Sequence, residues 1–139
     1  MKKDITFRPV EGVSIAVVPD SMVPVAGEQP GWQVYLLNMN EEVLQNVIIS
    51  SNGYGPGPEG ETIRTSTLRH VLPEVPPQAV AAVEPLDPAL FHLYNQYWVS
   101  YYIGSQVFDK KFVFEPGSIA TDKLTPIALL DQQPGVLHG

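Results

Sequence analysis

The prolines and glycines of this 139-residue chain, 14 and 11 in number, are spread along its whole length. Proline removes a backbone donor and fixes φ, while glycine raises the entropic cost of ordering the chain, so both interrupt helices and central strands. The apolar residues are therefore confined to short runs between these breaks. A chain divided in this way has no room for long helices, and the pattern predicts an all-β fold.

Alternation between apolar and polar residues marks the strands. In the first half, Trp32, Val34 and Leu36 share one face of a strand predicted over 32–38. The β-branched run 44–50 is predicted to be its antiparallel hairpin partner. Further strands are expected at 5–7, 13–18, 61–71, 78–84, 97–103 and 106–114.

Turn residues define the connections between these strands. The segments 21–31 and 53–60 are rich in proline and glycine. We expect the second to be a mobile hairpin tip, because its residues cannot form the interior of a strand. Asp87 directly before a proline predicts an N-cap and one short helical turn near residues 88–94. The tail 125–130 is expected to dock on the domain, either as a short helix or as an edge strand.

About seven short strands with one helical turn match an immunoglobulin-like Greek-key β-sandwich, formed by a single domain over residues 1–139. On the last predicted strand, Phe108, Phe112 and Phe114 share the core-facing parity. Lys110 falls on the same parity, so it is expected either to mark a β-bulge or to extend its stem to the edge of the sheet.

Charge and composition narrow the possible functions. Fifteen acidic residues against eight basic ones give a formal charge of −7, which opposes binding to nucleic acid. The absence of cysteine excludes disulfides, thiolate catalysis and cysteine-ligated metals. The start of the chain lacks the apolar run of a signal peptide, and no stretch approaches the ~18 apolar residues of a membrane span. We therefore expect a cytoplasmic protein that binds neither membranes nor nucleic acid.

The order of the predicted strands resembles that of bacterial immunoglobulin-like modules. In these modules a strand ending in asparagine, here 35–38, is followed by a β-branched strand, here 46–50. A proline-punctuated segment over 72–77 and a tyrosine-rich hairpin over 97–114 complete the resemblance. The cysteine pair of antibody domains is missing, so the likeness concerns architecture.

The whole chain also resembles a small bacterial family, judged by the segments 66–70, 97–104 and 109–112. Members of that family are sometimes labelled as a phenylalanyl-tRNA synthetase β-chain domain, which implies an accessory role beside an aminoacyl-tRNA synthetase. The chain shows no class II synthetase motif, is far too short for a synthetase subunit, and carries the wrong net charge for tRNA. The resemblance favours a free-standing domain and says little about its task.

No arrangement of residues points to catalysis. The histidines at 70, 92 and 138 lack the spacing that places two imidazoles on one metal, and a zinc site would require His70 and His92 to meet Asp87 in space. His138 is expected to fray. The chain has no Gly-x-Ser-x-Gly elbow, and the loop 53–60 lacks the lysine and the following helix of a phosphate cradle. We therefore predict a non-enzymatic protein with no catalytic residues, no metal and no cofactor.

Two groups of residues are candidates for binding. Arg64, Arg69 and His70, together with the loop 53–60, could line a pocket for an anionic metabolite, either in a small-ligand binder or in an enzyme. Loops at the end of a rigid sandwich commonly carry binding residues.

The second group is aromatic. If Tyr97 and Tyr101 point into the core, then Trp98 and Tyr102 lie on the opposite face of the strand, where large aromatics favour a protein interface. The opposite parity, and a purely structural role for all of these aromatics, remain open at this stage. Tyr54 is a third candidate for the interface. The main hypothesis is a protein-interaction or assembly module that self-associates or binds a protein partner through an edge strand or the aromatic face.

Overall fold

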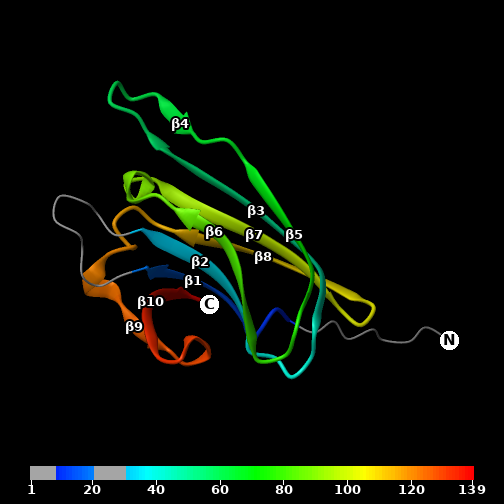
Figure 1. Ribbon diagram of the computed structural model, residues 1–139. Coiled ribbons are helices and arrows are strands. Elements are labelled where there is room, and N and C mark those ends of the chain that lie inside the picture. The colour runs from blue at the N-terminus through cyan, green and yellow to red at the C-terminus, as the bar shows by residue number, and fades with distance from the viewer. Residues whose placement is uncertain (1–8, 21–30) are drawn as a thin grey trace.

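Two antiparallel β-sheets packed face to face make up the computed structural model, which describes residues 9–20 and 31–139 (Figure 1). The strands are β1 (Val13–Pro19), β2 (Trp32–Asn38), β3 (Leu44–Pro56), β4 (Thr62–Arg64), β5 (Leu68–Val75), β6 (Ala79–Leu86), β7 (Tyr94–Ile103), β8 (Gln106–Phe114), β9 (Thr125–Ile127) and β10 (Gln133–His138). The first sheet has the order β6-β2-β1-β10-β9, and the second has the order β4-β3-β7-β8, with β5 also paired to β3.

The strands follow the chain order of an immunoglobulin-like Greek key. β1 and β2 pair in the first sheet, β3 crosses to the second sheet, and β6 returns to lie beside β2. β7 and β8 then cross again and continue the second sheet beside β3. These strands match A, B, C, E, F and G of that fold, with β5 in the C′ position. The predicted all-β sandwich is confirmed, although the described residues hold ten strands where about seven were expected.

Helical structure is limited to three 3₁₀ turns within the described residues, at η1 (Pro88–Leu90), η2 (Thr121–Lys123) and η3 (Ala128–Leu130). The predicted cap of η1 is present, because the Asp87 carboxylate accepts a hydrogen bond from the backbone amide of Ala89 at 2.9 Å. The turn is shorter than predicted, and Tyr94 already belongs to β7. No helix in the described residues is long and apolar enough to cross a membrane.

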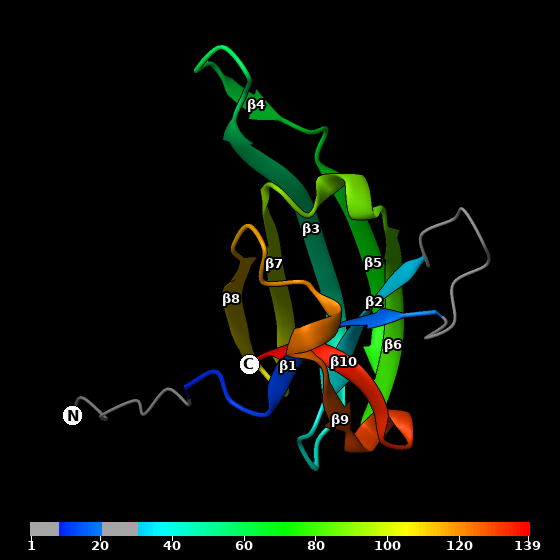
Figure 2. The same ribbon diagram turned by 90° about the vertical axis from the view of Figure 1, so that its left-hand side faces the viewer.

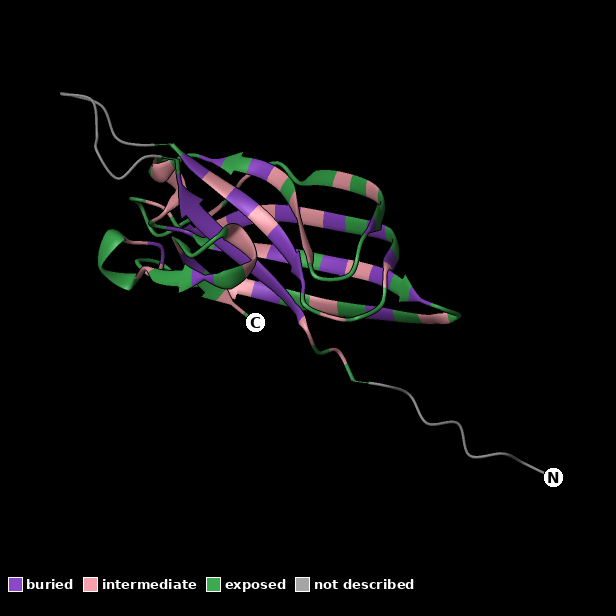
Figure 3. Cartoon of the chain, turned by 60° about the horizontal axis from the view of Figure 1, so that its bottom comes forward, coloured by how far each residue is buried: buried purple, intermediate pink, exposed green. Residues whose placement is uncertain are grey.

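The main core lies between the two sheets, and strands that alternate between buried and exposed residues are banded in Figure 3. Trp32, Val34 and Leu36 of β2 are buried as predicted. Burying a large apolar side chain contributes roughly 1.5–3 kcal/mol. The remaining core is made of aliphatic and aromatic side chains from both sheets, including Ile15, Val17, Leu44, Val47, Ile49, Tyr97, Val99, Tyr101, Phe108, Phe112 and Phe114.

A second, smaller apolar cluster covers the outer face of the first sheet. Ala16, Val18 and Leu37 are buried there against Ile127, with Leu129 and Leu130 of η3 packed at the edge. All seven residues of β1 are buried as a result. The C-terminal segment, orange to red in Figure 2, lies beside β1 and so docks as predicted, first as a strand and then as a 3₁₀ turn.

The predicted hairpin between the strands over 32–38 and 44–50 is wrong, because β2 and β3 belong to different sheets. The side chain of Asn38 helps to hold the crossover in place. It is fully buried, and its Nδ2 group donates to the carbonyl oxygens of Glu42, Val75 and Pro76 at 2.9, 3.2 and 3.0 Å. These bonds tie the end of β2 to the turn before β3 and to the end of β5. Both strands carry an apolar face, and the crossover buries these faces in one core.

The prediction that residues 53–60 cannot form the interior of a strand is also wrong. β3 continues to Pro56, with Tyr54 opposite Arg64 of β4 on one side and opposite Tyr94 of β7 on the other. Pro56 is the last residue of the strand, where the loss of a donor interrupts little of the ladder. The turn itself is confined to 57–60, where the Gly57 amide donates to the Glu61 carbonyl at 2.6 Å.

The edge strand predicted over 61–71 is present as two strands, β4 and β5, both paired with β3. Pro73 does not end β5. It lies opposite Asn46, whose φ of 50° marks an irregularity in β3 where no ladder pair forms. Proline is tolerated at such a position on an edge strand because its missing donor is not needed there.

The strands predicted at 13–18, 78–84, 97–103 and 106–114 are confirmed, each within a few residues of its predicted ends. Lys110 causes no bulge, since β7 and β8 keep an unbroken register, and its Nζ lies 4.9 Å from the centroid of the Phe112 ring. The predicted strand 5–7 lies outside the described residues, as does the predicted loop 21–31 except for its last residue.

The fraying expected for His138 is wrong, because β10 extends to this residue and pairs it with Ile15. Its imidazole packs edge-on against the rings of Phe112 and Phe114, with both centroid distances at 5.5 Å. Pro134 and Gly135 lie within β10 and do not end the structured tail.

Candidate functional site

The inner face of β3 changes from large to small side chains along its length. Val47 and Ile49 fill the core, and the next inward positions are Ser51, Gly53 and Gly55. Because inward positions recur every second residue, three small side chains in succession leave one end of the sandwich underfilled. A cavity of about 210 Å³ lies at this end, between the two sheets.

The cavity has apolar walls and one charged residue. Leu68, Leu86, Leu90 and Tyr97 provide the apolar surface, and Glu84 is the charged residue of the lining. The remaining lining residues are small or neutral and polar: Ser51, Asn52, Gly53, Thr65, Ser66 and Asn95.

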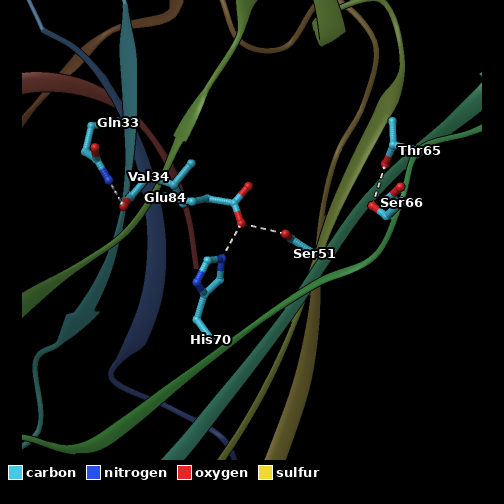
Figure 4. A network of polar contacts seen from close by, with 7 residues as sticks. All are labelled: Gln33, Val34, Ser51, Thr65, Ser66, His70 and Glu84. Atoms are coloured by element: carbon cyan, nitrogen blue, oxygen red, sulfur yellow. Dashed lines mark hydrogen bonds and ion pairs between the residues drawn. The ribbon is translucent and has the colours of Figure 1, made fainter.

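Glu84 projects into the interior from β6, where it pairs with the inward-facing Val34 of β2. Only 9% of the residue is exposed. Its Oε1 atom accepts hydrogen bonds from Ser51 Oγ at 2.6 Å and from His70 Nε2 at 2.7 Å, as Figure 4 shows. The carboxylate therefore connects the two sheets, since Ser51 and His70 belong to β3 and β5. Charge-assisted bonds of this kind are about twice as strong as neutral ones.

These three residues do not form the relay of a serine hydrolase. In such a relay the imidazole lies between the serine and the acid, so that it can accept the serine proton. Here Ser51 and His70 both contact the same carboxylate oxygen of Glu84. The geometry leaves Ser51 without an adjacent imidazole base and supports a binding role for the cluster.

Tyr97 lies beside the cluster and is 1% exposed. Burial raises the pKa of its phenol well above the ordinary value, and the negative charge of Glu84 raises the pKa further. The ring therefore stays neutral while the protein is folded, and the cavity contains no second negative charge from this side chain.

Backbone contacts shape the two sides of the cavity. The Nδ2 group of buried Asn95 donates to the carbonyls of Leu90 and Leu93 at 2.9 and 3.2 Å, which holds η1 over the apolar wall. On the other side, Thr65 Oγ1 accepts from the Gly53 amide at 2.7 Å and donates to the Ser66 carbonyl at 3.1 Å (Figure 4). A Cβ atom at Gly53 would lie 3.3 Å from Asn95 Oδ1, so this glycine leaves room for the asparagine.

The structure does not bring together the three residues predicted to bind an anionic metabolite. His70 faces inward and contacts Glu84. Arg69 is the neighbouring strand residue and pairs with outward-facing Ser50, while Arg64 lies with its guanidinium 6.0 Å from the centroid of the Tyr54 ring. Sequence reasoning missed Glu84, although an acidic residue inside the apolar strand 79–86 is a signal that could have identified it.

Most exposed large apolar residues lie on the outer face of the second sheet. We call this surface the outer face. It holds six of the nine exposed large apolar residues in the described part of the chain, and Trp98 and Tyr102 are 50% and 40% exposed. Strand pairing places the six on one side: Ile48 of β3, Val71 of β5, Tyr94, Trp98 and Tyr102 of β7, and Val107 of β8.

All three residues predicted to form an interface lie on this outer face. Trp98 and Tyr102 point outward because Tyr97 and Tyr101 are buried, which settles the parity that the sequence left open. Tyr54 stacks on Tyr94 with centroids 5.2 Å apart and rings 9° from parallel. No described segment packs over this face, in contrast to the outer face of the first sheet.

The outer face also differs in charge from the rest of the molecule. Its strands carry three outward cations, Arg64, Arg69 and Lys111, and two outward carboxylates, Glu74 and Asp109. Three positive charges less two negative ones leave +1 on this face, against −7 for the whole chain.

No group of three or more histidine, aspartate or glutamate side chains in the described residues could hold a metal ion. The comparisons with known proteins add no family: no protein-family model matches the chain, and no curated protein is significantly similar to it. The resemblances noted from the sequence remain predictions.

Proposed function

We propose that this chain is a non-enzymatic assembly module that forms a homodimer by packing two copies of the outer face against each other. The observation that carries the proposal is the concentration of six of the nine exposed large apolar residues on that face. Exposed apolar side chains gathered on one face favour an interaction site, and aromatic residues are enriched at interfaces.

The size of the face suits a stable interface. Four strands spaced about 4.8 Å apart and about 33 Å long cover roughly 630 Å² per copy. Two such faces bury roughly 1,300 Å² in total, which is near the lower limit for a specific, stable complex. The 10 residues of β7 run through the middle of the face and supply its three exposed aromatics.

The mixed charges of the outer face suit a second copy of the chain as its partner. Elsewhere on the surface, two molecules of charge −7 repel each other over most approaches. The outer face carries both signs, so a two-fold arrangement can set Arg69 and Lys111 of one copy near Asp109 and Glu74 of the other. A two-fold interface needs this kind of self-complementarity.

The test is the molecular mass in solution, measured by size-exclusion chromatography with light scattering. We expect a mass twice the 15.3 kDa of one chain and a shift to the monomer in the variant Trp98→Ser. Leu137→Ser is the matched control, because Leu137 is 47% exposed on β10, away from the face, and it should leave the dimer intact.

Two results would overturn the proposal. One is a monomeric wild-type protein at about 1 mM, where even weak complexes assemble. The other is a dimer that survives both Trp98→Ser and the double variant Trp98→Ser with Tyr102→Ser.

A further inference from the structure

We propose that the cavity between the sheets binds a small primary amine, whose ammonium group contacts Glu84 and whose alkyl part fills the apolar walls. The site is distinct from the proposed dimer surface, because Ser51 and Gly53 face the interior of the sandwich while Trp98 and Tyr102 face away from it. It does not depend on the dimer.

The carboxylate of Glu84 has one oxygen left for a ligand. Oε1 accepts both Ser51 and His70, and among the described residues Oε2 has no hydrogen-bond partner. In Figure 4 this second oxygen points away from both partners. Because Glu84 is only 9% exposed, water screens its charge less than that of a surface carboxylate, so a cationic donor placed against Oε2 is favoured.

The cavity fits a ligand with a short alkyl chain. If each non-hydrogen atom with its hydrogens takes up ~30 Å³, as a water molecule does, then the cavity volume of about 210 Å³ holds roughly seven non-hydrogen atoms. Leu68, Leu86 and Leu90 surround this space with aliphatic surface. A primary ammonium has three donors, and Ser51 Oγ keeps a lone pair that can accept one of them after donating to Glu84.

The sign of the charge selects the class of ligand. Glu84 is the charged residue of the lining. Arg64 and Arg69, which the sequence suggested for an anionic ligand, lie on the outer face. A carboxylate or phosphate ligand would approach Glu84 with like charge, and no lysine or arginine of the described residues lines the cavity. The cavity therefore favours cationic ligands over the anionic metabolites that the sequence suggested.

The experiment is a titration of the full chain, followed by backbone amide NMR shifts, with n-pentylamine and the matched anion pentanoate. We expect pentylamine to shift the amides around Ser51, Gly53 and Leu90, and pentanoate to shift none of them. Glu84→Gln, which keeps the shape and removes the charge, should weaken pentylamine binding by about 10- to 100-fold. Glu74→Gln makes the same charge change on the outer face and should leave the affinity unchanged.

A second variant keeps the test decisive if Glu84→Gln does not fold. Ser66 is exposed at the rim of the cavity, so Ser66→Leu should fill the space at little cost to folding and block pentylamine. Equal shifts with pentylamine and pentanoate would overturn the proposal, as would no shift at about 10 mM pentylamine, well above a millimolar Kd. Repeating the titration with the Trp98→Ser variant separates the two proposals, because the amine should still bind.

Discussion

The phenol of Tyr97 is almost fully buried beside a carboxylate, and its raised pKa links the fold to pH. Because the folded-state pKa lies above the ordinary value of 10.0, the unfolded chain releases this proton first as the pH rises. The free energy of unfolding is therefore unaffected by Tyr97 below about pH 10 and falls above it by about 1.4 kcal/mol per pH unit.

In the variant Tyr97→Phe, we expect the free energy of unfolding to fall less steeply with pH, because the contribution of this one proton is lost. Urea unfolding from about pH 9 to about pH 11 measures it, since the slope of stability against pH counts the protons released. Tyr102→Phe, which removes a hydroxyl from an exposed ring, is the control and should keep the wild-type slope. Identical slopes for Tyr97→Phe and the wild type would show that the buried phenol has no such role.

At the level of single residues, the sequence predicted which side chains are buried better than it predicted which side chains contact each other. The alternation along β8 was enough to place Phe112 inward, because side chains in a strand alternate strictly. For β7 the sequence left both parities open, and the structure shows that Trp98 points outward. The contact between His70 and Glu84 joins residues on β5 and β6 that face each other across the core. No local pattern encodes such a contact, since it depends on how two sheets stack.

Among the strands, β10 depends on a close approach at Gly135. A Cβ atom there would lie 2.7 Å from Ile127 Cδ1, 2.8 Å from Val18 Cγ2 and 3.2 Å from the Val17 carbonyl oxygen. We expect Gly135→Ala to destabilise the protein by roughly 1–3 kcal/mol, the usual cost of overpacking. Thermal or urea unfolding measures the loss.

Ile127→Val provides the matched background for this prediction, because it removes the Cδ1 atom that the new methyl group would meet. Gly135→Ala should then cost less in the Ile127→Val background than in the wild type, and a double-mutant cycle gives the difference. Strict additivity would mean that the damage arises elsewhere.

Strand positions were predictable from the sequence, and strand partners were not. β2 and β8 begin and end where alternation and turn residues placed them. The pairing of β2 with β1 and β6, and not with β3, follows from burying two apolar faces in one core, which is a property of the whole chain. The prediction for residues 53–56 failed for a different reason. Glycine is accepted inside a strand where a neighbouring side chain approaches closely, as Leu93 does at Gly55, and Pro56 is the last residue of β3.

Taken as a whole, the sandwich is asymmetric. One outer face is covered by the C-terminal segment around Ile127, and the other presents Trp98 and Tyr102 to solvent. The fold class was predictable because the short apolar runs exclude long helices. The asymmetry was not predictable. The sequence left open whether the segment 125–130 is a helix or a strand, and no pattern indicated which sheet it covers.

This asymmetry, combined with the net charge, predicts the salt dependence of the dimer. Repulsion between two chains of charge −7 extends over about 30 Å at 0.01 M salt and about 10 Å at 0.1 M. The dimer Kd should therefore fall severalfold as sodium chloride is raised from about 0.01 M to about 0.1 M. Sedimentation equilibrium measures this change. A Kd that rises with salt would instead assign the binding energy to ion pairs across the interface.

The row of small residues at Ser51, Gly53 and Gly55 has a consequence for protein engineering. Selection for heat resistance alone rewards substitutions that fill empty volume, and this end of the sandwich holds a cavity of about 210 Å³. Thermostable descendants should therefore accumulate bulkier residues at Ser51 or Ser66, because an added Cβ at Gly53 or Gly55 would crowd Asn95 and Leu93. They should lose the proposed binding of small amines as their melting temperature rises.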